Sequence, residues 1–294
     1  MKRKLLMMAF LVMSVAVSAQ YEDIGISRQL LANARKGNAE AMYQVGKLLN
    51  DSGEEGYLEG IESHEVWFEK AANLGHAQAQ YALGKDKSQF ARTPHEWFEV
   101  ATWYQKAAKN GVADAQNDLG ELCEKGQGVQ KDLELAAFWY NQSAQQNHDN
   151  GLYNYARCLL NGIGVSSNPA EAVPLLQYSS DQKNNLATCL LGECYLTGNG
   201  VEQNVQQAAA LFKKAADNYS ARGHYLLGLS YFYGAGVPQS YDEAFRQIKF
   251  ATNMNYGEAF YFLGLIHMEG EGVEKDTKTA QYYFDRAAEC GYVP

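Results

Sequence analysis

Apolar and polar positions along this chain follow a pattern that returns every 36 residues. Within one repeat, Ala187, Leu191 and Cys194 have the spacing of one helical face. A loop follows, and then a second apolar face that includes Ala208 and Leu211. The pattern predicts two helices in each repeat and no strands.

Glycine marks the repeat most clearly. One glycine stands in the middle of each predicted first helix, at Gly46, Gly84, Gly120, Gly192, Gly228 and Gly264, with Ala156 in the one missing place. A Gly-x-Gly-Val loop keeps the same step and begins at Gly126, Gly162, Gly198, Gly234 and Gly270. A fixed period of this length is typical of a solenoid, in which each repeat buries its apolar face only against its neighbours. We therefore expect an all-α solenoid of about seven 36-residue helix-turn-helix repeats.

Each repeat also carries its own helix start and stop signals. Gly192 lets the two helices of its repeat approach closely because it has no side chain, and Gly198 supplies the left-handed conformation that ends the first helix. Asn204 stands where the second helix needs an N-cap. Capping residues occupy the same place in other repeats, at Asp132, Asn168, Ser240 and Asp276. We expect each of them to accept hydrogen bonds from the first helical turn.

These repeats carry a family resemblance. The pattern Ala-x-Ala-x-x-x-Leu-Gly-x-Leu-Tyr-x-x-Gly-x-Gly-Val, followed by Ala-x-x-Trp-Tyr-x-x-Ala-Ala, resembles the Sel-1-like repeat, a relative of the tetratricopeptide repeat, over about residues 39–290. The resemblance implies a right-handed α-α superhelix and adaptor or scaffold roles in protein complexes. Some secreted members of that family brace their repeats with disulfides. At the corresponding places this chain has Asp217 and His224 instead.

The second repeat departs from the pattern. Lys85-Asp86 puts charge where a core leucine belongs, and the Gly-x-Gly-Val loop is missing, so we expect the first helix to end early. The segment Thr93 to Glu96 then predicts a restart with a capping box and with proline at the first helical position. Before the repeats, Ser27 to Lys36 predicts a single leading helix.

The first residues do not belong to the repeats. Lys2-Arg3-Lys4 precedes an apolar stretch from Leu5 to Val17, and the small residues that end at Ala19 resemble a signal-peptide cleavage site. About 13 apolar residues fall short of the ~20 that a membrane-spanning helix needs, which favours a cleaved signal over an uncleaved anchor. The expected division is a signal peptide over 1–19, the leading helix within 20–38 and the repeat solenoid over 39–294. The mature protein is then expected to be exported, periplasmic or secreted, with no stable membrane span.

The net charge of the chain argues against one class of partner, the nucleic acids. The formal net charge is −9, and loss of the three basic residues of the leader would make it −12. The chain contains no basic run, so we do not expect it to bind nucleic acid. A protein or peptide is the expected partner.

Residues with reactive side chains give no clear site. Cys158 and Cys194, two of five cysteines, stand at apolar core positions where buried thiols act as small hydrophobic groups. Export permits disulfides without placing them. The six histidines form no i, i+4 pair, so we expect no metal site. Ser180 and Lys183 fit the Ser-x-x-Lys motif of penicillin-interacting enzymes, but the other motifs of those enzymes are absent. We expect no catalytic residues, no cofactor and no enzymatic activity, with a hydrolase as the most distant alternative.

A second stripe on the first helices is the candidate site. It lies opposite the core face, at the positions three before, one after and four after the central glycine. The stripe is mixed or polar in the first three repeats and apolar in the sixth and seventh, where it consists of Tyr225, Leu229, Phe232, Tyr261, Leu265 and Met268. In tetratricopeptide-like solenoids this face lines the concave groove, and the resemblance implies the same here. Three explanations stay open: packing of these side chains on one another, self-association, or a hydrophobic floor for a partner.

The sequence thus predicts an exported adaptor or scaffold that binds a protein or peptide partner on its concave surface, with these six residues as the groove floor. The alternative is a structural subunit of an envelope complex that docks or self-associates through an uncapped C-terminal face. That alternative rests on the absence of a polar capping helix after Gly291.

Overall fold

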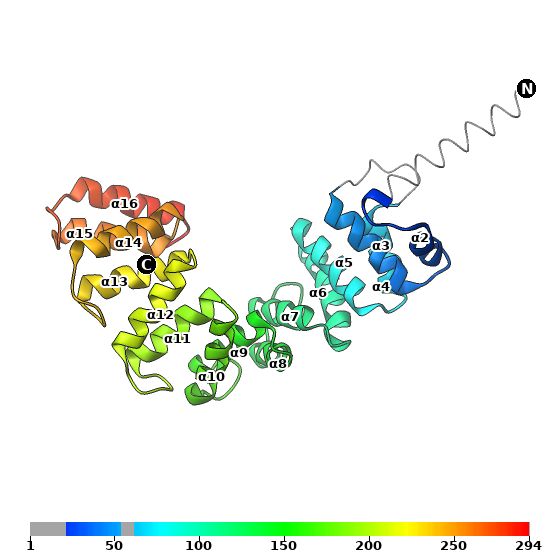
Figure 1. Cartoon of the computed structure of the whole chain (residues 1–294), viewed down its shortest axis with the longest axis horizontal. Helices are drawn as coiled ribbons and strands as arrows, with labels where there is room; N and C mark the ends of the chain where they lie inside the picture. Colours follow the sequence, from blue (N-terminus) through cyan, green and yellow to red (C-terminus); the bar gives the residue numbers. More distant parts are fainter. Residues whose placement is uncertain (1–21, 54–61, 294) are drawn as a thin grey trace, which may run out of the picture. The chain divides into compact units, whose positions relative to one another are not determined.

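The computed structural model describes residues 22–53 and 62–293, and within these ranges the chain forms fifteen α-helices and no strands (Figure 1). The helices are α2 Arg28–Arg35, α3 Ala39–Ser52, α4 His64–Asn73, α5 Ala77–Phe90, α6 Pro94–Lys109, α7 Ala113–Lys125, α8 Leu133–Ala144, α9 Asp149–Asn161, α10 Pro169–Asp181, α11 Asn185–Thr197, α12 Val205–Asp217, α13 Ala221–Tyr233, α14 Tyr241–Asn253, α15 Gly257–Glu269 and α16 Thr277–Glu289. The chain divides after Gln146 into two compact units, one with α2 to α8 and one with α9 to α16. The predicted all-α architecture is confirmed, and the predicted signal peptide lies outside the described residues.

Within each unit the helices pack in sequence order. Each first helix lies against the second helix of its own repeat, as α3 against α4 and α13 against α14, and each second helix contacts the first helix of the next repeat, as α12 against α13. The predicted leading helix is present as α2, where the Ser27 hydroxyl accepts a hydrogen bond from the Leu30 N–H and caps the N-terminus. Helix α2 packs on α3. It thereby covers an apolar face that the first repeat would otherwise expose.

The central glycines are the points of closest approach between paired helices. A Cβ added to Gly120 would lie 2.7 Å from Tyr140 Cε1, and one added to Gly228 would lie 2.5 Å from Ile248 Cγ1. Carbon atoms in contact ordinarily lie about 3.5–4.0 Å apart, so no side chain fits at these positions. The predicted role of the glycines is confirmed.

Within each unit, Gly-x-Gly-Val loops contact the preceding repeat. A Cβ on Gly200 would lie 2.3 Å from the Pro169 carbonyl oxygen, and one on Gly236 would lie 2.0 Å from the Val205 carbonyl oxygen. Pro169 and Val205 both begin the second helix of the preceding repeat. The loop backbone therefore rests directly on the neighbouring repeat, which explains the second glycine of the motif.

Most predicted N-caps are confirmed. The side chains of Asp132, Asn204, Ser240 and Asp276 each accept a hydrogen bond from a backbone N–H two or three residues later. The prediction is wrong for Asn168, whose side chain makes no capping bond. The Asn168 side-chain amide instead donates to the Glu171 carboxylate at 2.9 Å. The Glu171 backbone N–H, which a capping side chain would otherwise bind, donates to the Asn168 carbonyl oxygen at 3.1 Å.

The expectation for the second repeat is partly wrong. Helix α5 does not end early but runs to Phe90, because no glycine stands where Gly126 ends α7. Asp86 occupies the core position without breaking the helix, since His64 from α4 lies 3.1 Å from its carboxylate. The predicted capping box is confirmed at Thr93 and Glu96, with proline at the start of α6.

The cysteines fit the expectation of buried thiols. Cys123, Cys158, Cys189 and Cys194 are at most 2% exposed, Cys290 is half-buried, and none of the five forms a disulfide. The positions that hold bracing cysteines in some Sel-1-like proteins make other contacts, since Asp217 pairs with Lys213 and His224 bonds Gln247.

Thiol labelling tests this assignment. Burial raises the pKa of Cys123, Cys189 and Cys194 to about 11, so these thiols carry almost no reactive thiolate at neutral pH. We expect a disulfide-exchange reagent to label about one thiol rapidly in the folded protein and all five after denaturation without reductant. Fewer than four thiols after denaturation would mean that a disulfide forms, which would contradict the buried-thiol assignment.

Candidate functional site

The candidate site lies on the first helices of the last two repeats. We use the term apolar stripe for Tyr225 and Leu229 of α13 together with Tyr261, Leu265 and Met268 of α15. The first four side chains are half-buried, and Met268 is 37% exposed. These residues therefore touch solvent, although Tyr225 and Leu229 also pack against the core of the second unit. The packing of Tyr225 and Leu229 leaves the three explanations of the stripe open.

Phe232 does not belong to this surface. It is 1% exposed, and its ring meets the rings of Tyr241 and Phe262 edge-on, with 5.1 Å between centroids in each case. The prediction that this position faces solvent is wrong. Phe232 lies near the end of α13, where a long aromatic side chain reaches across to both α14 and α15.

Aromatic rings hold the apolar stripe in place. The Tyr225 ring lies 5.5 Å from that of Tyr256 and 6.3 Å from that of Phe262, and the Tyr261 ring lies 5.3 Å from that of Phe284. Burial, helped by nearby Tyr292 and Glu258, raises the pKa of Tyr225 to about 12. Its hydroxyl is therefore protonated at physiological pH. The stripe accordingly presents rigid apolar rings with a hydrogen-bonding group at the tip.

The equivalent stripe of the first unit is a polar network. Asn117 is 1% exposed, and its amide lies 3.2 Å from the carboxylate of Asp118 and 3.4 Å from that of Glu121. The Tyr81 hydroxyl donates to Asp118 at 3.1 Å. Helical spacing did not single out Asp118, because it lies one position outside the stripe. The stripe therefore changes from hydrogen-bonded acids in the first unit to apolar side chains in the second.

The half-buried Asp118 predicts a pH-dependent stability. Burial, the largest effect, raises its pKa, and the hydrogen bonds from Asn117 and Tyr81 offset only part of it. Between the unfolded value of about 3.9 and the higher folded value, the folded state binds more protons, so stability falls as pH rises through that window and stays lowered above it. We expect Asp118→Asn to raise the melting temperature at pH 7 and to change it little near pH 4. The exposed Asp114→Asn is the control, and an equal shift in both variants, or a lower melting temperature for Asp118→Asn at pH 7, would contradict the prediction.

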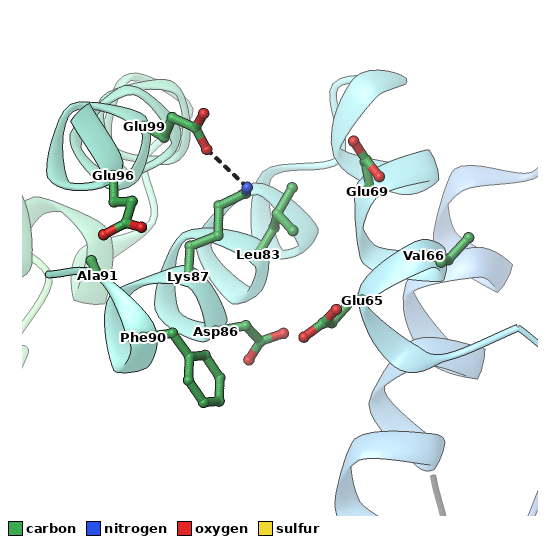
Figure 2. A pocket seen from close by; sticks show the side chains of 10 residues that line it. All are labelled: Glu65, Val66, Glu69, Leu83, Asp86, Lys87, Phe90, Ala91, Glu96 and Glu99. Carbon is green, nitrogen blue, oxygen red and sulfur yellow. Dashed lines mark hydrogen bonds and ion pairs between the residues drawn. The ribbon is translucent and has the colours of Figure 1, made fainter. Parts of the chain in front are cut away.

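A cavity of 310 Å³ lies beside the irregular second repeat (Figure 2). The lining comes from α4, α5, α6 and the connection after α5, and consists of Glu65, Val66, Glu69, Leu83, Asp86, Lys87, Phe90, Ala91, Glu96 and Glu99. The short connection from Ala91 to Thr93 replaces the loop that, in the regular repeats, rests on the preceding second helix. The loss of that loop leaves this space unfilled.

The charges in this cavity largely have partners within the protein. Lys87 and Glu99 form an ion pair at 3.0 Å, drawn in Figure 2. Glu96 accepts the backbone N–H groups of Arg92 and Thr93, and Asp86 faces His64. Three of the five carboxylates therefore serve the local fold.

The Ser-x-x-Lys motif is not assembled into a catalytic pair. The Ser180 side chain is fully buried, and its hydroxyl lies 2.9 Å from the Thr188 hydroxyl and 3.1 Å from the Lys214 ammonium. Lys183 stands in the following turn with a left-handed backbone, φ 70°. Ser180 is therefore inaccessible to a substrate. Across the described ranges, no group of three or more histidine, cysteine or acidic side chains is placed to hold a metal ion. No described helix has the length and apolar composition to cross a bilayer.

The helix pairs, their shared glycine contacts and their loops define a helical-repeat protein, and the comparison with known families agrees. The Sel1 repeat model matches residues 66–76, 101–112, 113–148, 150–184, 185–220, 221–246 and 257–292. These matches cover more than half of the chain. The chain therefore belongs to the Sel1 repeat family, as the sequence resemblance suggested.

Solved structures support the same fold. A Sel1 repeat protein from Oxalobacter formigenes is 24% identical with a TM-score of 0.74, over 84% of this chain and 96% of that one. A protective antigen of uropathogenic Escherichia coli strains, which displays an SLR fold, is 28% identical with a TM-score of 0.68, over 90% of this chain. This chain spans 56% of that antigen's length. The immunity protein PA5088 from Pseudomonas aeruginosa, 20% identical with a TM-score of 0.51 over 73% of this chain and 81% of that one, shares the fold. A comparison with curated proteins gave no match.

Proposed function

We propose that this protein is an exported, non-enzymatic adaptor that binds a protein or peptide partner on the concave face of its second unit. The apolar stripe is the observation that carries the proposal, because apolar side chains remain partly exposed on two successive first helices. Contiguous exposed apolar surface usually marks an interaction site. Membership of the Sel1 repeat family, whose members are typically protein-interaction scaffolds, supports the same function.

The packing of the first helices supports a concave location. Helices α11 and α13, the first helices of successive repeats, contact each other directly. In a superhelix of helix pairs, the helices that approach each other across repeats form the inner side of the curve. The apolar stripe continues this row from α13 to α15.

The composition of the stripe suits a peptide or protein rather than a polar small molecule. Tyr225 and Tyr261 offer large rings at little cost in conformational entropy, and tyrosine is enriched among energetically dominant interface residues. Met268 adds a flexible apolar side chain that adapts to irregular surfaces. No cofactor is needed for this role.

A second candidate is docking or self-association through the last helix, as a structural subunit of an envelope complex. On α16, Tyr282 is 57% exposed, and Val293 beyond it is 80% exposed. An exposed tyrosine and valine at the same end of the second unit favour this candidate. It uses different residues from the apolar stripe, so the two can be separated by substitution.

Export rests on the leader, which lies outside the described residues. The basic start, the short apolar stretch and the small residues before Gln20 support cleavage after Ala19. N-terminal sequencing of the protein from its own cells is expected to begin at Gln20. A protein that retains Met1 or remains in the cytoplasm would contradict the export proposal alone.

The binding proposal is tested by a matched pair of substitutions. Leu265→Lys places a charge in the apolar stripe, whereas Phe250→Lys removes a 49% exposed aromatic from α14, outside the stripe. We expect Leu265→Lys to abolish capture of the partner that the wild-type protein retrieves from its own envelope fraction, and Phe250→Lys to leave capture intact. Equal loss in both variants would indicate nonspecific apolar adhesion and overturn the proposal.

A further inference from the structure

A histidine caps the first helix of the second repeat. His76 precedes α5, and its Nδ1 atom accepts a hydrogen bond from the Ala79 backbone N–H at 3.1 Å. Asparagine holds the same place before α3, where the Asn38 side-chain oxygen accepts from the Ala41 N–H at 2.8 Å. The residues that helix N-caps prefer are serine, threonine, aspartate and asparagine, and histidine is not among them. His148 caps α9 in the same way as His76 caps α5.

The second ring nitrogen of His76 reaches the preceding repeat. Its Nε2 atom lies 2.8 Å from the carboxylate of Glu40 on α3, and the side chain is only 16% exposed. Because the Ala79 N–H needs a lone pair on Nδ1, the proton of the neutral ring is on Nε2 and is donated to Glu40. Both bonds exist together only in this neutral form. His76 thereby joins the first turn of α5 to α3.

Glu40 is the charged group that faces the ring. Hydrogen bonds from Gln44 and from His76 lower the pKa of Glu40, so this carboxylate stays ionised over the whole range in which histidine titrates. The Tyr43 ring, also on α3, stacks on the imidazole with 4.7 Å between centroids. The turn from α4 into the cap carries no charge, since it consists of Leu74 and Gly75.

On the other elements around α5, charged side chains contact groups other than His76. Lys70 of α4 pairs with Glu62. The ammonium of Lys106 on α6 lies over a tryptophan ring of its own helix. Asp118 of α7 accepts a hydrogen bond from Tyr81, further along α5. The charge state of His76 is therefore coupled most directly to Glu40.

Protonation of the ring affects its two bonds in opposite ways. A proton on Nδ1 occupies the lone pair that the Ala79 N–H needs, so two donors then face each other and the cap is lost. The bond to Glu40 is strengthened by the opposite charges, and the face of the Tyr43 ring is a favourable place for a cation. The charged ring therefore remains on α3 and no longer binds α5.

We propose that His76 is a pH-dependent latch between the first two repeats. The neutral ring joins the first turn of α5 to α3, and the charged ring stays bound to α3 and releases that turn. Gln78 of the released turn lines a cavity of 260 Å³ together with Tyr43 of α3, so acidification loosens one wall of this cavity. The latch goes beyond the adaptor function proposed above and does not depend on it, because the apolar stripe lies in the other unit.

The test follows amide exchange with water in the wild-type protein by ¹⁵N–¹H NMR, from about pH 8 to pH 5, across the ordinary titration range of histidine. The Ala41 amide, which Asn38 caps, is the internal control. After correction for the intrinsic effect of pH on exchange, we expect the protection of Ala79 relative to Ala41 to fall about fivefold on acidification, which corresponds to the ~1 kcal/mol of a typical N-cap. The ring ¹⁵N signals of His76 should show the Nε2-protonated neutral form at the alkaline end, and the loss of protection should follow protonation of Nδ1.

Two variants assign the effect to His76. His76→Asn supplies a cap that does not titrate, as Asn38 does in the preceding repeat, and it should remove the pH dependence at Ala79. His95→Asn is the matched control, because the His95 side chain is 82% exposed and lies 3.6 Å from Glu99 of its own helix. It should leave the pH dependence intact. Both variants retain Asp118, so any contribution from its titration is the same in each.

Several results would overturn the latch. One is a protection of Ala79 that does not change with pH, and another is an equal loss at Ala41, which would show a general effect of acid on helix starts. A pH dependence that persists in His76→Asn would assign it to a different group. A neutral ring protonated on Nδ1 would contradict the arrangement of the two bonds from which the latch is inferred.

Discussion

Replacement of Gly228 by leucine is expected to destabilise the fold by about 3 kcal/mol, at the upper end of the range for overpacked cores. The first added carbon alone would lie 2.5 Å from Ile248 Cγ1 and 3.2 Å from the Ala244 carbonyl oxygen. Because the second contact is with helix backbone, rotation of one side chain cannot relieve the clash, and α13 and α14 must move apart. The measurement is the thermal midpoint, which falls by about 2–4 °C for each kcal/mol in a protein of 150–250 residues.

Two companion variants make this prediction specific. Gly228→Ala should destabilise less than Gly228→Leu, since Ala156 shows that one repeat accommodates a methyl group at this place. Ile248→Ala in the Gly228→Leu background should recover part of the loss, because it removes the atoms nearest to the new side chain. An unchanged thermal midpoint for Gly228→Leu, or no recovery in the double variant, would mean that the helices do not cross at this glycine.

The second large effect is expected for the double variant Leu229→Lys/Leu265→Lys. Both side chains are partly exposed, so a lysine stem can occupy the apolar position while its ammonium reaches water. Each substitution should therefore cost less than about 1 kcal/mol in stability. Partner binding should fall far more, since an apolar anchor at an interface is worth about 2 kcal/mol or more, which is roughly thirtyfold in affinity. The measurements are the melting temperature, the mass in solution and capture of the partner.

The same variant separates the three explanations of the stripe. A folded variant that loses partner capture supports the binding proposal. A folded variant that loses oligomers but keeps capture would assign the stripe to self-association. An early melt would show that Leu229 and Leu265 are packed core, and would remove the site assignment while leaving the repeat fold intact.

Local signals made most of the fold predictable. Gly228 and Gly236 recur at fixed steps because each meets atoms of a neighbouring helix or repeat that also recur, so the sequence alone reveals the constraint. The leading helix was predictable from the residues between Ser27 and Lys36. The capping box at Thr93 and Glu96 is likewise encoded within four residues.

The errors arose where a side chain contacts a distant part of the chain. Spacing places Phe232 on the stripe opposite the core face of its helix, but its ring packs on Phe262, thirty residues later. The charge at Asp86 led to the prediction that the helix ends early. In the structure the helix continues, because His64 from another helix lies close to the Asp86 carboxylate. A helical period gives the direction of a Cα–Cβ bond and not the contacts of a long side chain.

One feature of the polar stripe in the first unit was invisible to pattern analysis. Asp118 was missed because its hydrogen bond comes from Tyr81 in the preceding repeat, and because it lies beside the expected stripe rather than on it.

Site-specific photocrosslinking tests the central claim most directly. A photoreactive phenylalanine analogue is placed either at the position of Tyr261, in the apolar stripe, or at the position of Tyr282, which is 57% exposed on α16. Both substitutions replace one aromatic ring by another, so both proteins should fold. Binding at the apolar stripe predicts that the probe at Tyr261 crosslinks a single partner in the native envelope fraction and that the probe at Tyr282 does not. Crosslinking from Tyr282 alone would contradict it and would favour docking through the last helix.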